Sequence, residues 1–363
     1  MSNSYGQGRE DIYVNAYRAT ILLRFLTGWG KRKIWRALLK LGYKVSINTV
    51  NHWLHHNKKH RFRPSSLEKA LFYHQAYEMA IIVKKLHPNW GYKKISSYIN
   101  KHLPIRVPGL TVYFWITGRS KPNTTPIKPC PALGYLVGVL VGDHKRTKDG
   151  HGLSVKNKEF AKYYAKKYWE TTGVKLKIHE KDGYWKTYDN AGWLKELWYS
   201  KLWKVVAYVY PLEFLKGLFD SEGAVSPRVD HKKRALYSVK ISLVNGDREV
   251  IGFAKKILVD YGLKASEHHI PPKVKAKKGK SKKSRELWIL YMYGWESLEK
   301  FATLIGFRES KRKRRILLLL KLRHLKPSER FKEWSKHYRR SSVHWEEKLP
   351  LFTKIIKNIE NKN

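Results

Sequence analysis

The sequence is poor in cysteine and acidic residues and has no long apolar run. One cysteine, Cys130, occurs in 363 residues, which excludes a disulfide framework and a zinc site built from cysteines. No run of about twenty consecutive apolar residues is present, so we expect no membrane insertion. The polar start, Met1 to Asp11, does not have the pattern of a secretion signal. The cytoplasm, in association with the nucleoid, is the expected location.

The shortage of acids leaves a large excess of positive charge. There are 29 Asp and Glu against 75 Lys and Arg, a formal net charge of +46. Such a surface attracts polyanions with an affinity that falls as salt rises, and a ribosomal or architectural nucleic-acid binder would also carry it. The apolar fraction of 42%, with 14 Trp and 23 Tyr, predicts two or three globular units rather than a disordered basic chain.

One helix-sized phrase occurs twice, and each copy ends in a carboxylate. The copies are Leu136–Asp143, LVGVLVGD, and Leu215–Glu222, LKGLFDSE. In each copy two small residues lie one helical turn apart on the same face, and small residues at this spacing let two helix backbones approach closely. If the two helices pack through these faces, Asp143 and Glu222 leave the same end of the pair as neighbours.

The residues after each phrase are also repeated. Segment 165–175 matches segment 254–264 in its Ala-Lys-Lys and Gly-x-Lys positions. Each unit is predicted to form a helix, two strands, a second helix and two more strands, closed by helices near 193–202 and 295–305. An internal duplication is the simplest interpretation. The basic stretch Pro271–Ser284 is too polar to pack and is predicted to be a mobile, phosphate-contacting loop.

The first 128 residues contain four acids and a second duplication. The pair Trp29-Gly recurs at Trp90-Gly, and the pattern Thr-Val-x-x-Trp ends at both Trp53 and Trp115. Each copy predicts three short helices, which in the first copy cover about 17–27, 31–41 and a third helix to residue 56. The third helix of the second copy carries Tyr113 and Phe114 on the face that would be polar in a DNA reader, so this copy is expected to pack.

In the first copy, Ser46 or Asn48 is the expected N-cap of the third helix. A helix, a short turn and a capped helix with Thr-Val-x-x-Trp resemble the helix-turn-helix of recombinases and transposases. The resemblance implies that this helix enters the major groove of DNA. Val50, Trp53 and Leu54 would then lie in the core. The exposed readers would be Asn48, Thr49, Asn51, His52 and His55. A merely solvated helix face is an equally open interpretation of each.

The predicted fold is α+β: two pseudo-symmetric αββαββα repeats preceded by an all-α helix-turn-helix region. Four prolines between Pro122 and Pro131 mark the clearest boundary. The predicted divisions are 1–63 and 64–121 for the two helical copies, 122–131 for the Pro-rich linker, 132–207 and 208–322 for the repeats, and 323–363 for a basic C-terminal extension.

The two phrases and the units around them, about residues 132–322, resemble the LAGLIDADG homing endonucleases in their single-chain, two-repeat form. With the N-terminal helix-turn-helix region, the chain is similar to archaeal, intron-encoded or free-standing members. The resemblance implies that each repeat lays a four-stranded sheet into the major groove of double-stranded DNA. It also implies that the carboxylates of Asp143 and Glu222 share Mg²⁺ or Mn²⁺ over the scissile phosphates, with Gly142 and Ser221 as further metal ligands.

The chemistry of such a site is independently reasonable. Oxygen-only ligation suits Mg²⁺ better than zinc, and metal held by two carboxylates can orient a water and neutralise the leaving 3′ oxygen. The ninth motif position departs from the family pattern, because His144 stands where the second copy keeps Gly223. This substitution predicts unequal activity at the two half-sites. Asp220 is expected to be a surface or capping group rather than a third ligand.

The resemblance also implies a basic residue near each carboxylate. Strand alternation favours Lys156 in the first repeat, and Lys240 is expected at a comparable strand site in the second, with Arg228 as its rival. A simple phosphate contact is an open interpretation of all three. The hairpin after Glu222 is expected to bind DNA through Arg228, Lys232, Lys233 and Arg234.

The expected function is a site-specific homing endonuclease that makes metal-dependent double-strand breaks in a long DNA target by phosphodiester hydrolysis. Both repeats belong to one chain, so a monomer is expected to bind one site. The alternative keeps the scaffold without cleavage, as an intron RNA maturase or a DNA-binding regulator. Double-stranded DNA is the expected partner, with intron RNA as the partner of a maturase.

Overall fold

The structure is a computed structural model in which two compact units can be described. The units are Met1–Ser221 and Glu222–Asn363. No helix in the part of the chain described is long and apolar enough to cross a membrane. The described ranges are 4–55, 64–147, 150–189, 191–272, 274–277, 280–283, 285–341 and 345–348.

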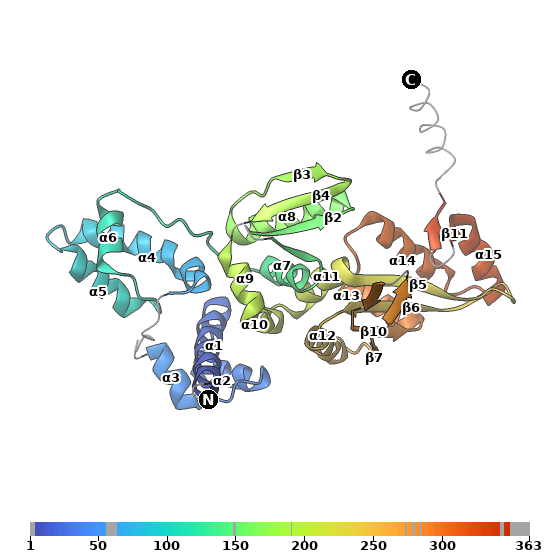
Figure 1. Cartoon of the computed structure of the whole chain (residues 1–363), viewed down its shortest axis with the longest axis horizontal. Helices are drawn as coiled ribbons and strands as arrows, with labels where there is room; N and C mark the ends of the chain where they lie inside the picture. Colours follow the sequence, from blue (N-terminus) through green and yellow to red (C-terminus); the bar gives the residue numbers. More distant parts are fainter. Residues whose placement is uncertain are drawn as a thin grey trace, which may run out of the picture. The chain divides into compact units, whose positions relative to one another are not determined.

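The first unit opens with an all-helical region, which confirms that part of the predicted fold (Figure 1). Its helices are α1 Ser4–Thr27, α2 Lys31–Lys40, α3 Ile47–His55, α4 Ser66–Leu86, α5 Tyr92–His102 and α6 Gly109–Ile116. Helix α1 begins well before the predicted start at residue 17. Ser46, rather than Asn48, caps α3, because its Oγ accepts the Thr49 N–H at 3.1 Å. Residue 56, the predicted end of this helix, lies outside the described residues.

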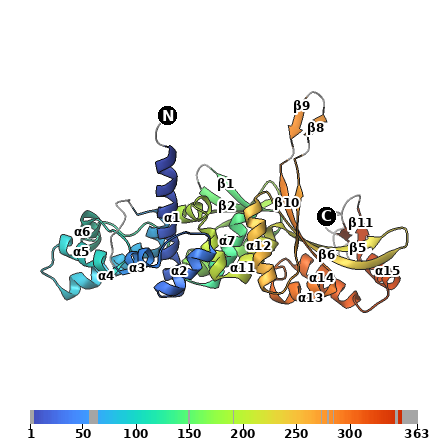
Figure 2. The same ribbon diagram turned by 90° about the horizontal axis from the view of Figure 1, so that it is seen from below.

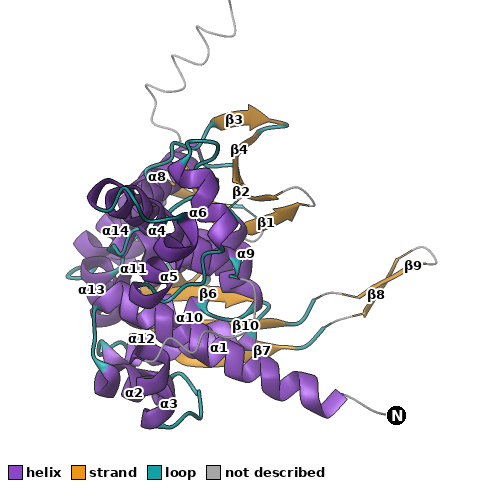
Figure 3. Cartoon of the chain, turned by 90° about the vertical axis from the view of Figure 1, so that its left-hand side faces the viewer, coloured by secondary structure: helices purple, strands orange, loops and turns teal. Residues whose placement is uncertain are grey.

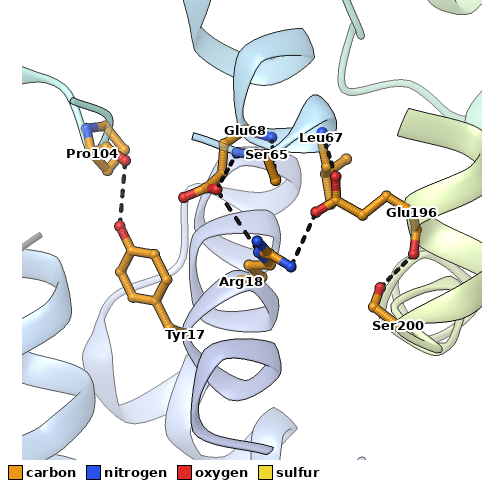
Figure 4. Close-up of polar contacts among 8 residues, drawn as sticks. All are labelled: Tyr17, Arg18, Ser65, Leu67, Glu68, Pro104, Glu196 and Ser200. Atoms are coloured by element: carbon orange, nitrogen blue, oxygen red, sulfur yellow. Dashed lines mark hydrogen bonds and ion pairs between the residues drawn. The ribbon is translucent and has the colours of Figure 1, made fainter. Parts of the chain in front are cut away.

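An ionic junction joins α1 and α4 to helix α9, Gly192–Tyr199 (Figure 4). The Arg18 guanidinium lies 3.8 Å from Glu68 Oε2 and 3.5 Å from Glu196 Oε1. Glu196 also accepts the N–H of Leu67 at 2.8 Å, at the start of α4. The three side chains are at most about one fifth exposed, so solvent screens the charges only in part. The helical region is thereby fastened to the following α/β part.

The Pro-rich connector is packed against that same part. The Ile127 N–H bonds the carbonyl of Ala70 at 3.1 Å, and the Lys128 N–H bonds the carbonyl of Thr171 at 2.8 Å. The Ile127 side chain is buried. The connector therefore joins α4 to the end of helix α8, Lys158–Thr172, and Met1–Ser221 forms one compact unit.

The α/β part of the first unit holds one antiparallel sheet in the strand order β1-β2-β4-β3 (Figure 3). Helix α8 packs on one face through buried Phe160, Tyr164 and Tyr168. Residues 148–149, between β1 and β2, lie outside the described residues. The elements are α7 Pro131–Val141, β1 His144–Thr147, β2 Gly150–Val155, α8 Lys158–Thr172, β3 Ile178–Lys181, β4 Tyr184–Asp189, α9 and α10 Trp203–Val209.

Helix α11, Pro211–Glu222, leads into a second antiparallel sheet with the order β5-β6-β10-β7. Buried residues alternate with half-buried or exposed ones along β6, so one face belongs to the core and the other is more open. Helices α12 and α13 contact this sheet. The elements are β5 Gly223–Asp230, β6 Ala235–Asn245, α12 Arg248–Asp260, β7 Ser266–Ile270, β10 Leu287–Tyr293 and α13 Trp295–Leu304.

The basic stretch between β7 and β10 is not the predicted loop. It contains β8, Val274–Lys277, and β9, Lys280–Lys283, which pair antiparallel as a separate ribbon (Figure 2). A two-stranded ribbon satisfies its own backbone groups without a packed core, so polarity alone did not exclude strands.

Helix α14, Ser310–Leu322, and the C-terminal extension lie against the β5–β6 hairpin. The extension contains α15 Pro327–His337, β11 Tyr338–Arg340 and β12 Trp345–Glu347. The ring of His231, at the hairpin turn, stacks on Trp345 with centroids 5.8 Å apart. The Arg315 side chain donates to the carbonyls of Val225 and Trp345. Residues 345–347 pair with β11 as a strand.

Candidate nucleic-acid interface and paired acids

The repeated phrases form the helices α7 and α11, which touch through glycines. A Cβ atom on Gly138 would overlap the carbonyl oxygen of Phe214, and one on Gly217 would overlap the carbonyl oxygen of Tyr135. Gly134 also takes part, because a Cβ there would lie 2.7 Å from Cβ of Tyr210. The close approach expected from the sequence is therefore present, although the sequence argument overlooked Gly134.

The two helices run in the same direction. Gly134 lies against Tyr210 and Glu213, and Gly138, one turn later, lies against Phe214 and Leu218. Contacts that advance together along both chains require parallel axes. Within Met1–Ser221, the C-terminal ends of both helices therefore lie at the same end of the pair.

The two acids occupy the same kind of corner in the chain. Asp143 is exposed and stands between the end of α7 and His144, the first residue of β1. Glu222 is half-buried, ends α11 and directly precedes Gly223, the first residue of β5. Each carboxylate thus follows a glycine-faced helix and precedes the first strand of a four-stranded sheet.

The predicted neighbours of these acids have defined local roles. Gly142 is the C-cap of α7, with φ −94° and ψ −99°. The Ser221 hydroxyl donates to the carbonyl of Gly217 at 3.1 Å and keeps its lone pairs for other partners.

Oxygen donors of this kind fit Mg²⁺ or Mn²⁺, with waters completing the coordination. Within the described ranges, no three His, Cys, Asp or Glu side chains gather in a group that could hold a metal.

Asp220 is not the surface or capping group that the sequence suggested. It is 5% exposed, and its Oδ2 accepts a hydrogen bond of 2.9 Å from the Tyr135 hydroxyl. The residue lies on the face of α11 that meets α7, so burial requires a donor. The phenol supplies this donor, which gives the carboxylate a structural role in the helix pair.

The two candidate lysines do not occupy comparable strand sites. Lys156 follows the end of β2, next to Asn157, which caps α8. Lys240 lies inside β6, opposite Ser226 and Tyr293. Lys156 Nζ lies 5.7 Å from the Tyr184 ring centroid, and Lys240 Nζ lies 4.9 Å from that of Tyr291. The expectation of equivalence was wrong because of strand register: Lys156 lies three residues after Leu153 and Lys240 three residues before Leu243, although these two leucines each pair with the first residue of the first strand of their sheet.

The face of the second sheet that is turned away from its core carries a cluster of cations and rings. We call this side, with its counterpart in the first sheet, the open face. The Arg228 guanidinium lies 5.2 Å from the Tyr293 ring centroid, and the rings of Tyr291 and Tyr293 are 5.8 Å apart. Lys240 lies over Tyr291. Cations held over an exposed ring, Tyr293, and a half-buried one, Tyr291, suit a polyanion with stacked bases and sugars.

The hairpin that follows Glu222 presents basic side chains at its turn. Asp230 Oδ1 accepts the N–H groups of Lys232 and Lys233 at 3.0 and 3.1 Å, which folds the turn and leaves both side chains exposed. Arg234 has a positive φ of 47° and its guanidinium lies 5.9 Å from the Phe331 ring centroid on α15.

The predicted readers on α3 lie on its less buried side. Val50 and Trp53 are buried as expected, with Trp53 held edge-to-face by Tyr13 and Tyr17. Leu54 is half-buried rather than part of the core. Among the readers, Asn48 and His55 are exposed, whereas Thr49, Asn51 and His52 are half-buried.

Corresponding contacts recur in the two sheets and were not noticed in the sequence. In each unit the N-cap of the second helix, Asn157 or Asp247, is followed by a cation that lies over a tryptophan. Lys158 Nζ is 4.1 Å from the Trp185 ring centroid, and the Arg248 guanidinium is 4.7 Å from that of Trp288. On β4, Trp185 lies two residues before the residue that pairs with Leu153. On β10, Trp288 lies two residues before the residue that pairs with Leu243.

The positions of these two leucines are equivalent, because Leu153 and Leu243 each pair with the first residue of the first strand. The shared contact therefore comes from matching places in both sheets. The sequence signal was present as a basic residue directly after Asn or Asp, but the two tryptophans are too far along the chain for a short-range pattern to link them.

Comparison with known proteins identifies one domain. Residues 210–306, which include α11 and the second sheet, match the family model described as a LAGLIDADG-like domain. An uncharacterized protein of Methanocaldococcus jannaschii is 27% identical over 283 residues, which are 69% of this chain and 96% of that protein. The resemblance is thus confirmed in its coarser form, as a LAGLIDADG-like domain over residues 210–306.

Solved structures with a similar course of the chain include two kinds of protein. I-DmoI in complex with DNA and Mn is 15% identical and covers 48% of this chain and 96% of its own, with a TM-score of 0.34. Full-length WhiA from Thermotoga maritima is 14% identical and covers 64% of this chain and 66% of its own, with a TM-score of 0.33.

Proposed function

We propose that this protein is a site-specific DNA endonuclease of the LAGLIDADG type, in a single-chain form with two repeats. The observation that carries the proposal is the equal placement of Asp143 and Glu222. Each acid stands at a corner between a glycine-faced helix and the first strand of a sheet. A fold that needed only packing from these helices would not require a carboxylate at both corners.

The two-repeat form is supported by contacts as well as by the repeated phrase. Both sheets have the same strand order, and both carry a cation over a tryptophan at matching positions. An internal duplication explains the order and the contacts together. By this proposal one chain supplies both halves of the nuclease and binds its target as a monomer.

In the proposed reaction, water attacks the phosphorus, the bond to the 3′ oxygen breaks, and the products are a 5′ phosphate and a 3′ hydroxyl. Asp143 and Glu222 would hold Mg²⁺ or Mn²⁺, with Gly142 and Ser221 contributing oxygen atoms beside them. A bound divalent ion lowers the pKa of water and offsets charge on the leaving oxygen. Lys156 and Lys240 would stabilise phosphate charge, and their unequal positions lead us to expect unequal strand cleavage.

DNA binding is proposed to use three surfaces. The open faces of the sheets would lie against the major groove, and the hairpin residues Arg228, Lys232, Lys233 and Arg234 would contact phosphates. Helix α3 would read bases through Asn48, Thr49, Asn51, His52 and His55. The net charge of +46 supports such a partner.

The alternative is binding without cleavage, as an intron RNA maturase or a DNA-binding regulator. The observation that favours it is the cluster of Arg228, Lys240, Tyr291 and Tyr293, which can bind nucleic acid whether or not the acids hold metal. The nuclease and the binder therefore differ in the chemistry at Asp143 and Glu222, not in the surfaces they use.

The proposal is tested by selecting a DNA target from a randomised duplex library and incubating it with Mg²⁺ or with EDTA. The wild type is expected to cut both strands only with metal. Asp143→Asn and Glu222→Gln are each expected to abolish double-strand cuts or reduce them to nicks, with a target affinity within about threefold of wild type.

Asp260→Asn is the matched control, because Asp260 is also an exposed acid at the end of a helix but follows no glycine-faced interface. It should cut like the wild type. If the wild type binds the target tightly but does not cut it in Mg²⁺ or in Mn²⁺, the nuclease proposal is rejected in favour of a maturase or regulator.

A further inference from the structure

A histidine and a tyrosine lie ring to ring on the open face of the first sheet. His179 on β3 and Tyr188 on β4 have centroids 5.3 Å apart and ring planes 21° apart. His179 is opposite Lys186, so Tyr188 is its diagonal neighbour two residues along β4. Both rings are exposed, and that of Tyr188 is 51% accessible.

The second sheet contains the same pair at the same place. His268 on β7 and Tyr291 on β10 have centroids 5.1 Å apart, with ring planes tilted by 56°; His268 is exposed and Tyr291 is half-buried. His268 is opposite Ile289, and Tyr291 again lies two residues further along the partner strand. Tyr188 and Tyr291 also occupy corresponding positions. Tyr188 directly follows the residue that pairs with Leu153, and Tyr291 directly follows the residue that pairs with Leu243.

Folding gives a reason for the matched contacts on the core side but little for those on the open side. The contact of Lys158 with Trp185, like that of Arg248 with Trp288, joins a helix to its sheet. The His–Tyr pairs bury no core. Cross-strand aromatic pairs add only about 0.2–1 kcal/mol to a sheet, so repetition on an exposed surface points to a ligand with two corresponding halves.

We infer that the two His–Tyr pairs are equivalent contacts to the sugar-phosphate backbone of duplex DNA, one in each half of the target. The inference rests on DNA binding by the proposed nuclease and does not need cleavage. Imidazole and phenol can each donate to a phosphate oxygen, and their faces can pack on deoxyribose. Because backbone contacts position rather than specify, they suit a pair kept in both halves of an asymmetric target.

The second half is predicted to be held more strongly. Lys240 lies over Tyr291, and Arg228 lies over the neighbouring Tyr293. The position in β2 that corresponds to Lys240 is Gly150, three residues before Leu153, which offers no side chain. The His268 pair therefore works beside Lys240 and Arg228, whereas the residue opposite His179 is Lys186.

The test is phosphate-ethylation interference on the selected target duplex, with the full chain in EDTA so that binding is read without cutting. His179→Ala is expected to remove interference at one or two phosphates in one half, and His268→Ala at the corresponding phosphates of the other half. The two positions should lie at equal distances from the centre. Each variant should weaken binding about 3- to 10-fold, the range of one hydrogen bond.

Glu180→Ala is the matched control, because Glu180 is an exposed neighbour of His179 on the opposite side of β3. It should leave the interference pattern unchanged. Tyr188→Phe and Tyr291→Phe keep the rings and remove the hydroxyls, so they show whether the phenol O–H makes the contact.

The outcomes separate this inference from the proposed nuclease. Two symmetric losses in a protein that does not cut would support the inference and remove the nuclease. A third outcome is that the protein cuts DNA while neither histidine substitution changes the interference pattern, or while both change it in the same half of the target. Either result would overturn the inference and keep the nuclease. If the loss of interference in the histidine variants depends on the identity of the base pair, the His–Tyr pairs read bases, and their proposed role at the DNA backbone is overturned. Absence of duplex binding would overturn both.

Discussion

The Tyr135 hydroxyl donates a hydrogen bond of 2.9 Å to Oδ2 of Asp220 across the contact between α7 and α11, and both residues are buried. Tyr135→Phe removes the donor and leaves part of a buried carboxylate without its partner, so we expect the free energy of unfolding to fall by about 1–3 kcal/mol. Urea denaturation at neutral pH measures it. A loss as small as that of an exposed substitution such as Tyr199→Phe would contradict a structural role for Asp220.

The glycines at the same contact should not tolerate a methyl group. Gly138→Ala and Gly217→Ala each place a Cβ against a backbone carbonyl of the other helix, so we expect losses of about 1–3 kcal/mol or more from overpacking. Gly252→Ala in α12 is the control, because nothing lies within 4 Å of its added Cβ. That change should stabilise the protein by about 0.5–1 kcal/mol. Thermal or urea unfolding of the three variants gives the comparison.

The ionic junction of Arg18 with Glu68 and Glu196 should be coupled. Arg18→Met leaves two mostly buried carboxylates without their cation, with an expected cost of about 1–3 kcal/mol. In a Glu196→Gln background the same change should cost less, because the amide can still accept the Leu67 N–H without carrying charge. A double-mutant cycle by urea unfolding measures the difference. Equal costs in both backgrounds would show that Arg18 and Glu196 do not interact.

Asp189, at the end of β4, makes stability depend on pH. Burial raises the pKa of its carboxyl, opposed in part by hydrogen bonds from Tyr168 and the Ala191 N–H. The folded protein therefore keeps a proton that the unfolded chain releases near its ordinary pKa of about 3.9. This contribution to stability is complete below that value and is lost as pH rises through the folded pKa, with a slope of at most about 1.4 kcal/mol per pH unit.

Asp189→Asn should remove this slope, since the amide stays neutral and can still accept the Ala191 N–H. Urea unfolding of wild type and variant across the acidic range measures the effect. The control is Asp182→Asn, an exposed acid in the β3–β4 turn, which should leave the contribution of Asp189 in place. An unchanged slope in Asp189→Asn would show that the carboxyl is ionised in the folded protein.

Local patterns in the sequence were sufficient for most helices and strands. Apolar spacing and the stop at Gly42 predicted α2 to within one residue of its observed end, because these signals act within one helical turn. The closeness of α7 and α11 was also predictable, since Gly138 and Gly217 have no side chain to keep two backbones apart. The sequence did not predict the lysine-rich ribbon β8–β9, because its polar residues indicated a loop. The two strands nevertheless pair with each other.

What the sequence determined by itself was the order of elements, the repeated helix with its terminal acid, and the excess of positive charge, all of which depend on neighbouring residues or on composition. Tertiary structure decided which positions correspond between the sheets. It separated Lys156 from Lys240, buried Asp220 beneath Tyr135, and brought His179 to Tyr188 and His268 to Tyr291. These relationships depend on strand register and on contacts between residues far apart in the chain, and a short-range pattern carries no information about either.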